Sequence, residues 1–239
     1  MTIRIAMWSG PRNISTAMMR SWENRSDCSV VDEPFYAFYL AQTQSPHPMF
    51  EQVLASQSTQ YEEVATQLSS GNVTTPVQYQ KHMTHHMLNN CFDWAIELKH
   101  CFLIRNPKEV VASYTNSRGV CTAEEIGIIR QAEIYTLLTQ QTGQEIPIID
   151  SNDVLKSPEG MLRKLCDRLS VPFEQNMLHW PAGKRDSDGV WASHWYHSVE
   201  RSKGFAPYQE KTILLSDWQQ EVVEQVMPAY MALYEKRLR

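Results

Sequence analysis

Residues 3–22 read Ile3-Arg4-Ile5-Ala6-Met7, then Trp8-Ser9-Gly10-Pro11-Arg12-Asn13-Ile14-Ser15-Thr16, then Ala17-Met18-Met19-Arg20-Ser21-Trp22. This order predicts a short apolar strand, a tight loop and an amphipathic helix. Such a loop directs backbone N–H groups toward the N-terminus of a helix, where unsatisfied donors and the helix dipole favour an anion. Arg12 adds a charge suited to phosphate or sulfate oxygens, and Ser15 and Thr16 add hydroxyl donors. The alternative is an ordinary strand–turn–helix in which Ser15 only caps the helix.

The loop is not a nucleoside-triphosphate loop of the Walker type. That pattern ends in Gly-Lys-Ser/Thr, where the lysine contacts the terminal phosphates and the hydroxyl binds magnesium. The present loop contains no lysine, and its residues stand in a different order. The anion that it binds is therefore expected to differ from the triphosphate of ATP or GTP held on magnesium.

Size and composition limit the class of protein. The 239 residues contain no Gly/Ser tract, charge block or internal repeat, so we expect a single α/β domain over residues 1–239. A net charge of −5 and a pI near 5.9 argue against nucleic acid as a partner. No apolar run approaches the roughly 18 residues that span a bilayer, so no membrane partner is expected. Five cysteines without Cys-x-x-Cys spacing predict reduced thiols in a cytoplasmic protein. The oligomeric state is left open.

Short apolar runs alternate with helical patterns along the chain. Strands are predicted at residues 3–7, 28–32, 76–80, 100–104 and 146–150. Helices are predicted at residues 15–25, 36–42, 50–70 with a break, 84–91, 107–117, 123–143, 158–170 and 216–237, the last kinked at Pro228. This alternation implies a parallel central sheet with helices on both faces. Ligands bind beyond the carboxyl ends of such strands, and Arg12, Glu33, Lys81 and Arg105 all follow predicted strands.

A second candidate anion-binding segment follows the fourth predicted strand. Cys101-Phe102-Leu103-Ile104-Arg105-Asn106-Pro107 runs from strand into helix, with Asn106 suited to cap the helix and Pro107 to its first position. Ser113 lies nearly two turns into the helix, at the flank of its apolar stripe, where a ligand contact is feasible. The alternative is a surface arginine and an exposed helix serine.

Taken together, these two segments resemble the sulfotransferases that use 3′-phosphoadenosine-5′-phosphosulfate (PAPS). The first is similar to their Pro-Arg/Lys-Ser-Gly-Thr-Thr loop, and most of all to a bacterial group with Trp-Ser-Gly-Pro-Arg-Asn-x-Ser-Thr. Arg-Asn-Pro at a strand end, with a serine eight residues after the arginine, resembles the segment that holds the 3′-phosphate of PAPS. The resemblance implies a three-layer P-loop sandwich and sulfuryl transfer, without a metal, to a hydroxyl or amine of a small molecule.

The resemblance also implies a role for each matching residue. Arg105 and Ser113 would hold the 3′-phosphate, and Arg12 would carry the charge at the bridging and leaving oxygens. Ile14 stands where these enzymes usually carry glycine, so the backbone there has to suit a β-branched side chain, which disfavours positive φ. The residues that would bind the 5′-phosphosulfate are Gly10, Pro11, Arg12, Asn13, Ile14, Ser15 and Thr16.

Near the C-terminus, a weaker match is found. These sulfotransferases often close the 3′-phosphate pocket with a late Arg-Lys-Gly loop. Here Arg201, Lys203 and Gly204 could correspond to it, although Ser202 interrupts the pair. A solvated basic loop is the alternative.

Two kinds of residue compete for the role of base at an acceptor hydroxyl. Glu33 follows the second predicted strand, and in sulfotransferases of the tyrosine-modifying type a catalytic glutamate follows the loop arginine at a similar distance. Its alternative is helix capping. Cytosolic sulfotransferases use Lys-x-His at the end of the third strand; position 83 is methionine here, so His85 or His86 would serve. A metal on His82, His85 and His86 would lack a glutamate or cysteine to complete the set.

Two other functions stay open as alternatives. A small-molecule kinase that uses ATP requires a loop lysine, which is absent, and an acidic magnesium ligand after a strand, which Asp150 could supply. A non-catalytic domain that binds a nucleotide and regulates a partner would bind the same ligand without turnover. Aromatic residues in the loop-rich segment 174–212 would line an acceptor pocket or form a satellite core.

Overall fold

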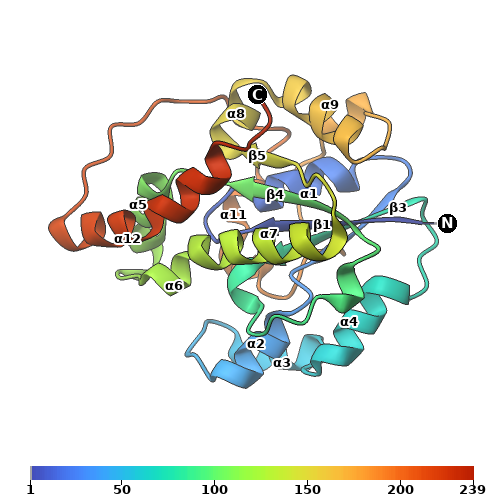
Figure 1. Cartoon of the computed structure of the whole chain (residues 1–239), viewed down its shortest axis with the longest axis horizontal. Coiled ribbons are helices and arrows are strands. Elements are labelled where there is room, and N and C mark those ends of the chain that lie inside the picture. The colour runs from blue at the N-terminus through green and yellow to red at the C-terminus, as the bar shows by residue number, and fades with distance from the viewer. Residues whose placement is uncertain (1) are drawn as a thin grey trace.

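The computed structural model describes residues 2–239, which form a five-stranded sheet flanked by helices (Figure 1). The strand order is β2-β3-β1-β4-β5, and every neighbouring pair is parallel. This confirms the predicted α/β fold with a parallel central sheet. The strands are β1 (Ile3–Ser9), β2 (Cys28–Asp32), β3 (Val77–Met83), β4 (Lys99–Ile104) and β5 (Ile148–Asp150).

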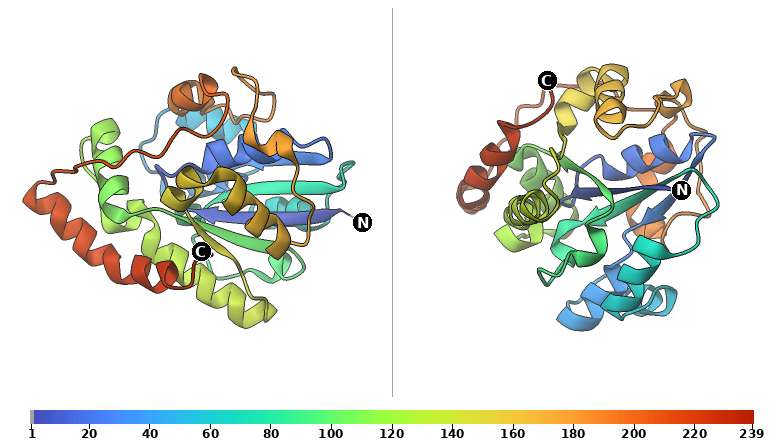
Figure 2. Two further views of the ribbon diagram at one scale, coloured as in Figure 1. Left: turned by 90° about the horizontal axis from the view of Figure 1, so that it is seen from above. Right: turned by 45° about the vertical axis from the view of Figure 1, so that its right-hand side comes forward.

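Helices cover both faces of the sheet (Figures 1 and 2). Alternate residues of the central strand β1 point to opposite faces, so Ala6 and Trp8 join one buried cluster and Ile5 and Met7 the other. The first cluster includes α4 (Tyr61–Ser70), α5 (Pro107–Arg118), α7 (Ile128–Thr142) and α12 (Asp217–Tyr234). The second includes α1 (Ser15–Glu23), α2 (Tyr36–Thr43) and α9 (Pro158–Arg168).

Shorter helices connect these layers. They are α3 (Phe50–Ser56), α6 (Ala123–Ile126), α8 (Ser151–Lys156), α10 (Ala192–Trp195) and α11 (His197–Glu200). The helix predicted over 123–143 is divided into α6 and α7 by Gly127, whose φ of +71° ends the first of them. Helix α8 was not predicted; Asp150, the last residue of β5, accepts a hydrogen bond from the Asn152 N–H at 2.9 Å and caps it.

The largest departure from prediction lies at the end of the third strand. The predicted strand over 76–80 continues to Met83, and the helix predicted over 84–91 is wrong: only a 3₁₀ turn, η1 (Thr84–His86), forms there. All seven residues of β3 are buried. The last residues of β3 were missed because Lys81 and His82 are polar, which is not typical of a buried strand. Their side chains find partners only once the neighbouring strands are in place.

Two further observations complete the fold. Helix α12 runs on through Pro228 without interruption, and the five cysteines are free, four of them buried. In the part of the chain that the structure describes, no helix has the length and apolar character needed to cross a membrane.

Candidate functional site

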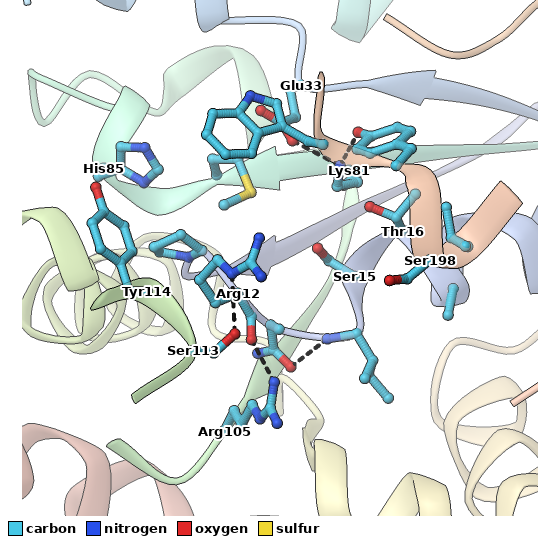
Figure 3. Close-up of a pocket in the computed structure, with 18 of the residues that line it drawn as sticks. Arg12, Ser15, Thr16, Glu33, Lys81, His85, Arg105, Ser113, Tyr114 and Ser198 are labelled. Carbon is cyan, nitrogen blue, oxygen red and sulfur yellow. Dashed lines mark hydrogen bonds and ion pairs between the residues drawn. The ribbon is translucent and has the colours of Figure 1, made fainter. Parts of the chain in front are cut away.

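A cavity of about 510 Å³ opens beyond the carboxyl ends of the strands (Figure 3). Its walls come from the loop after β1, the ends of β2, β3 and β4, helix α5 and the late segment 195–206. In Figure 3, Arg12 lies between Arg105 and the pair formed by Glu33 and Lys81. The sequence-predicted site residues on its lining are Pro11, Arg12, Asn13, Ile14, Ser15, Thr16, Glu33, His85, His86, Arg105, Ser113 and Gly204.

The loop after β1 leaves the N-terminus of α1 open. Ile14 is the N-cap residue and gives no side-chain cap, so Ser15 does not play the capping role of the alternative interpretation. The backbone at Ile14 has φ −85°, in line with its β-branched side chain, and the positive φ of the loop falls on Arg12 instead, at 55°. The uncapped first turn of α1 thus presents N–H donors to the cavity, which Ser15 and Thr16 also line.

Asn13 and Gly10 shape the loop without presenting free groups to the cavity. The Asn13 amide nitrogen donates to the Leu103 carbonyl at 2.9 Å, and its oxygen accepts from the Ile14 N–H at 2.9 Å, which ties the loop to β4. Gly10 does not line the cavity. A Cβ at Gly10 would lie 2.8 Å from the Ile126 carbonyl oxygen, so glycine is required there by close packing.

Arg12, Arg105 and Ser113 come together from three separate segments. Arg12 Nε donates to Ser113 Oγ at 3.1 Å, and Arg105 Nη1 donates to the Arg12 carbonyl at 2.6 Å. Arg105 is itself held by Glu109 at 2.9 Å. Among residues 2–239, no carboxylate forms an ion pair with Arg12. Burial, followed by the charges of Arg105 and Arg118, lowers the pKa of Arg12. The result is an uncompensated positive site suited to an anion.

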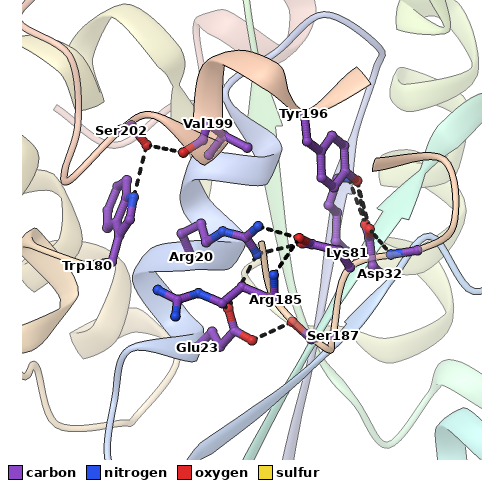
Figure 4. A network of polar contacts seen from close by, with 12 residues as sticks. Arg20, Glu23, Asp32, Lys81, Trp180, Arg185, Ser187, Tyr196, Val199 and Ser202 are labelled. Atoms are coloured by element: carbon purple, nitrogen blue, oxygen red, sulfur yellow. Dashed lines mark hydrogen bonds and ion pairs between the residues drawn. The ribbon is translucent and has the colours of Figure 1, made fainter. Parts of the chain in front are cut away.

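Lys81 has the opposite environment. Its ammonium group donates to Glu33 Oε1 at 2.7 Å (Figure 3). It also donates to Asp32 Oδ1 at 2.8 Å and to the Tyr196 hydroxyl at 2.6 Å, two residues that Figure 4 labels. Tyr196 in turn donates to Asp32 Oδ2 at 2.7 Å, which also accepts from the Gly189 N–H at 3.1 Å. The two carboxylates hold the pKa of Lys81 well above its ordinary value, against the effect of burial. This network fastens the late segment to the ends of β2 and β3.

Glu33 belongs to this network and also faces the cavity. Its backbone has φ 42°, an uncommon conformation for a glutamate, held by the N–H bond to the Lys81 carbonyl at 2.9 Å. Gln57 Nε2 donates to the Glu33 carbonyl at 3.1 Å from the other side. Burial and the neighbouring Asp32 raise the pKa of Glu33, while Lys81 acts in the opposite direction. A buried carboxylate with a raised pKa is a more effective proton acceptor than an exposed one.

His86 is buried and His85 partly buried, and the pKa of each is lowered. Burial, aided by His47 and Arg118, lowers the pKa of His85 to about 3, and His86 is lowered well below its usual value. His86 stacks between the rings of Tyr36 and Tyr39, with centroid distances of 4.6 and 4.9 Å. Imidazoles with such low pKa values are weak bases. Both histidines line the cavity, as does Glu33, whose pKa burial raises.

His82 lies on the other face of β3 and stacks on Trp8 at 4.4 Å. The three histidines 82, 85 and 86 therefore do not converge, because the strand alternates and the helix that would have aligned them does not form. In the described residues, 2–239, no group of three or more histidines, cysteines and carboxylates is placed to hold a metal ion.

The late basic loop contributes less than its sequence match implies. Arg201 and Lys203 are exposed and lie outside the cavity lining, whereas Gly204 and the interrupting Ser202 line it. A Cβ at Gly204 would lie 2.9 Å from the Leu178 carbonyl oxygen, so this glycine allows a close approach. Ser202 is occupied by hydrogen bonds from Trp180 Nε1 at 3.0 Å and to the Val199 carbonyl at 2.7 Å (Figure 4).

Several cavity residues were not predicted from the sequence. Tyr114 and Arg118, one helical turn apart on α5, could have been found from the i, i+4 pairing of an aromatic ring with a cation. His47 had no local pattern that pointed to the cavity. Trp195, Tyr196 and Phe205 belong to the segment 174–212, whose aromatic residues were predicted to line an acceptor pocket or form a satellite core, and all three line the cavity.

Two curated proteins of Arabidopsis thaliana are similar to this chain. A plant protein from Arabidopsis thaliana named "Branched-chain-amino-acid aminotransferase-like protein 1" is 36% identical over 235 residues, 96% of this chain. The chain spans only 41% of the length of the curated relatives that it matches, and their name describes those longer proteins.

Solved structures share the fold. The sulfotransferase domain from the curacin biosynthetic pathway has a TM-score of 0.57 at 19% identity, covering 95% of this chain and 98% of that one. A mouse sulfotransferase complexed with PAP has a TM-score of 0.52 at 10% identity, covering 96% and 84%. The model of the family described as "Sulfotransferase domain" matches residues 3–237, nearly the whole chain. The chain therefore belongs to the sulfotransferase domain family.

Proposed function

We propose that this protein transfers a sulfuryl group from PAPS to a hydroxyl or amine of a small molecule. The observation that carries the proposal is that Arg12 without a carboxylate partner, the open N-terminus of α1, Arg105 and Ser113 meet in one cavity. Each of these groups supplies donors or positive charge, and their combined charge suits a ligand with anionic groups at two ends. Family membership and the relative solved with PAP support the same conclusion.

The donor would be held along the loop and α5. Arg12 and the first turn of α1, with Ser15 and Thr16, would bind the 5′-phosphosulfate, and Arg105 with Ser113 would bind the 3′-phosphate. The residues fit this ligand because their donors are left without carboxylate partners, apart from the Glu109 contact that orients Arg105. When bound, PAPS supplies the sulfuryl group on a phosphate that can leave.

Within this arrangement, the chain's own residues divide the work. Arg12 stabilises the negative charge that grows on the leaving oxygens, because its contact with Ser113 already orients it in the free protein. Glu33 accepts the proton of the acceptor hydroxyl. Lys81 donates a hydrogen bond to that carboxylate and so holds it in place. Tyr196 and Asp32 position Lys81 in turn. His85 and His86 then line the acceptor side as neutral groups.

Asp150, the candidate magnesium ligand of the kinase alternative, has a structural role instead. Asp150 does not line the cavity. Its two oxygens accept hydrogen bonds from the Asn152 N–H at 2.9 Å and the Tyr230 hydroxyl at 3.1 Å. The carboxylate is therefore a helix cap that also anchors α12.

Calorimetric titration tests the donor. Adenosine 3′,5′-bisphosphate should bind about 10- to 150-fold more tightly than adenosine 5′-phosphate, because the latter lacks the charge-assisted bonds to the 3′-phosphate. Ser113→Ala and Arg105→Gln should narrow that ratio, and the exposed Lys203→Gln should not. Equal affinity for the two nucleotides contradicts the proposal, and tight magnesium-dependent binding of ATP would support the kinase instead. Tight bisphosphate binding without sulfate transfer to any acceptor would support the regulatory domain.

A further inference from the structure

A second unpaired cation, Arg118, lines the cavity at the end of α5. Its guanidinium lies 4.8 Å from the ring centre of Trp195 and 5.2 Å from that of Tyr114. Nη1 donates to the Tyr114 hydroxyl at 3.2 Å, and Nη2 donates to Nε2 of His47. Within residues 2–239, Arg118 forms no ion pair with a carboxylate. Its positive charge is thus oriented but not neutralised.

His47 fixes the orientation of this guanidinium. Arginine can only donate hydrogen bonds, so Nε2 of His47 accepts and the ring proton lies on Nδ1, which donates to the Tyr36 hydroxyl. Burial and the charge of Arg118 lower the pKa of His47 to about 4, which keeps this ring neutral. The remaining N–H groups of Arg118 are free to meet a ligand.

Arg118 is distinct from the residues that would hold the donor. Arg105 and Ser113 contact Arg12, whereas Arg118 contacts His47 and Trp195, and through His47 it is linked to Tyr36. Tyr36 and Tyr39 enclose His86 on this side of the cavity, close to Glu33 in the chain. Arg118 therefore belongs to the wall that a second substrate would meet.

A nearby carboxylate does not neutralise Arg118. Glu125 also lines the cavity, but its side chain accepts a hydrogen bond from the Thr122 N–H at 2.9 Å as part of the capping box of α6. It lies beyond ion-pair distance of the guanidinium. Arg118 is partly buried and lines the cavity, so its free N–H groups can meet a ligand there, and a ligand carboxylate matches its planar fork.

We infer that the acceptor is a hydroxy acid, whose carboxylate binds Arg118 and whose apolar body packs against the aromatic wall of Tyr36, Tyr39, Tyr114 and Trp195. This inference rests on the proposed sulfuryl transfer and names its second substrate. The hydroxyl, at the other end of the acceptor, would lie toward Glu33 and Arg12. In the transfer the hydroxyl oxygen bonds to sulfur, the bond from sulfur to the phosphate oxygen of PAPS breaks, and the hydroxyl proton passes to Glu33.

Matched probes test the charge. The protein saturated with adenosine 3′,5′-bisphosphate is titrated with 4-hydroxyphenylacetate, its neutral amide and the cationic tyramine, by calorimetry and by quenching of tryptophan fluorescence. The acid should bind at least about tenfold more tightly than the amide, and tyramine most weakly, because only the acid forms a charge-assisted pair with Arg118. Equal affinity of acid and amide, or no binding of the acid, overturns the inference.

Variants assign the preference to this arginine. Arg118→Gln should abolish the preference for the acid over the amide, and Arg118→Lys should retain part of it, because a point charge replaces the fork. Lys108→Gln, an exposed change on the same helix that removes the same charge, should leave it intact. A preference that survives in Arg118→Gln assigns the acid to another group and overturns the inference.

The two proposals fail separately. If the bisphosphate binds the wild-type protein and all variants tightly but the acid shows no preference over the amide, the hydroxy acid is wrong and the donor site stands. If the bisphosphate binds no better than adenosine 5′-phosphate, sulfuryl transfer from PAPS fails, and this inference fails with it.

Discussion

Two cations, Arg12 and Lys81, line one cavity in opposite surroundings. Lys81 is almost completely buried and donates to Asp32, Glu33 and Tyr196, so all three of its N–H groups are used. Arg12 is only partly buried, and the side-chain contact it makes is with the neutral Ser113.

The difference shows how the chain distributes charge between stability and binding. A buried ammonium without carboxylates would cost several kcal/mol, so Lys81 must be balanced from within the protein. Arg12 lies where water or a ligand can reach it, so its charge can stay unbalanced until an anion binds. Removing each cation should therefore affect a different property of the protein.

The largest effect is expected for Lys81→Met. Loss of the ammonium leaves Asp32 and Glu33 buried side by side, which should lower the free energy of unfolding by about 3–5 kcal/mol. Urea unfolding at pH 7 measures this. The double variant Lys81→Met/Asp32→Asn should recover part of the loss, since one buried charge is then removed. A single variant as stable as the wild type would show that Lys81 is not balanced in the way described.

Arg12→Ala should affect turnover strongly and stability very little, unlike Lys81→Met. Turnover should fall by about 100- to 1000-fold, because the charge at the leaving oxygens is lost. Stability should change by less than about 0.5 kcal/mol, since no buried partner is left unpaired. Steady-state kinetics and urea unfolding on the same sample separate the two effects, and Arg12→Lys should keep part of the rate. Normal sulfate transfer in Arg12→Ala would remove its catalytic role.

Glu33 belongs both to the paired surroundings of Lys81 and to the open cavity around Arg12, because it contacts Lys81 and also lines the cavity. Glu33→Gln should lower turnover by about 100-fold, whereas His85→Asn and His86→Asn should retain most of the activity. The pH profile alone cannot separate these residues, because burial raises the pKa of Glu33 and lowers the pKa of His85 to about 3. A wild-type rate in Glu33→Gln together with loss in one histidine variant would assign the base to that histidine.

The effect that is smallest per pH unit concerns His82, the neighbour of Lys81 on β3, which lies on the other face of that strand and stacks on Trp8. Burial lowers the pKa of His82 from 6.5 to about 3, so the unfolded chain binds a proton there that the folded protein does not. Stability from this histidine is complete above pH 6.5 and falls as the pH drops toward 3, at up to about 1.4 kcal/mol per pH unit. His82→Gln should flatten the slope of unfolding free energy against pH by that amount between pH 4 and 6. An unchanged slope in His82→Gln would show that His82 does not contribute to this pH dependence.

Much of the fold and part of the candidate site were predictable from local patterns. The strand–loop–helix around Arg12 and the Arg-Asn-Pro after β4 follow from short-range rules of apolar runs, capping and helix entry, and both lie where they were expected. The carboxyl ends of parallel strands then bring Arg12 and Arg105 together for topological reasons. The extension of β3, the missing helix after it and the division at Gly127 depended on partners distant in the chain.

Local patterns along the chain were enough to predict the parallel α/β fold and the family, because these rest on the period of apolar residues and on two motifs whose chemistry is local. Tertiary structure alone decided which charges are free. Lys81 and Arg12 both follow apolar runs, yet only folding places Asp32 and Tyr196 on one of them. It also decided that Arg201 and Lys203 lie outside the cavity and that Arg118 lies inside it. The physical reason is that pairing and desolvation depend on groups that lie close in space but far apart in the chain.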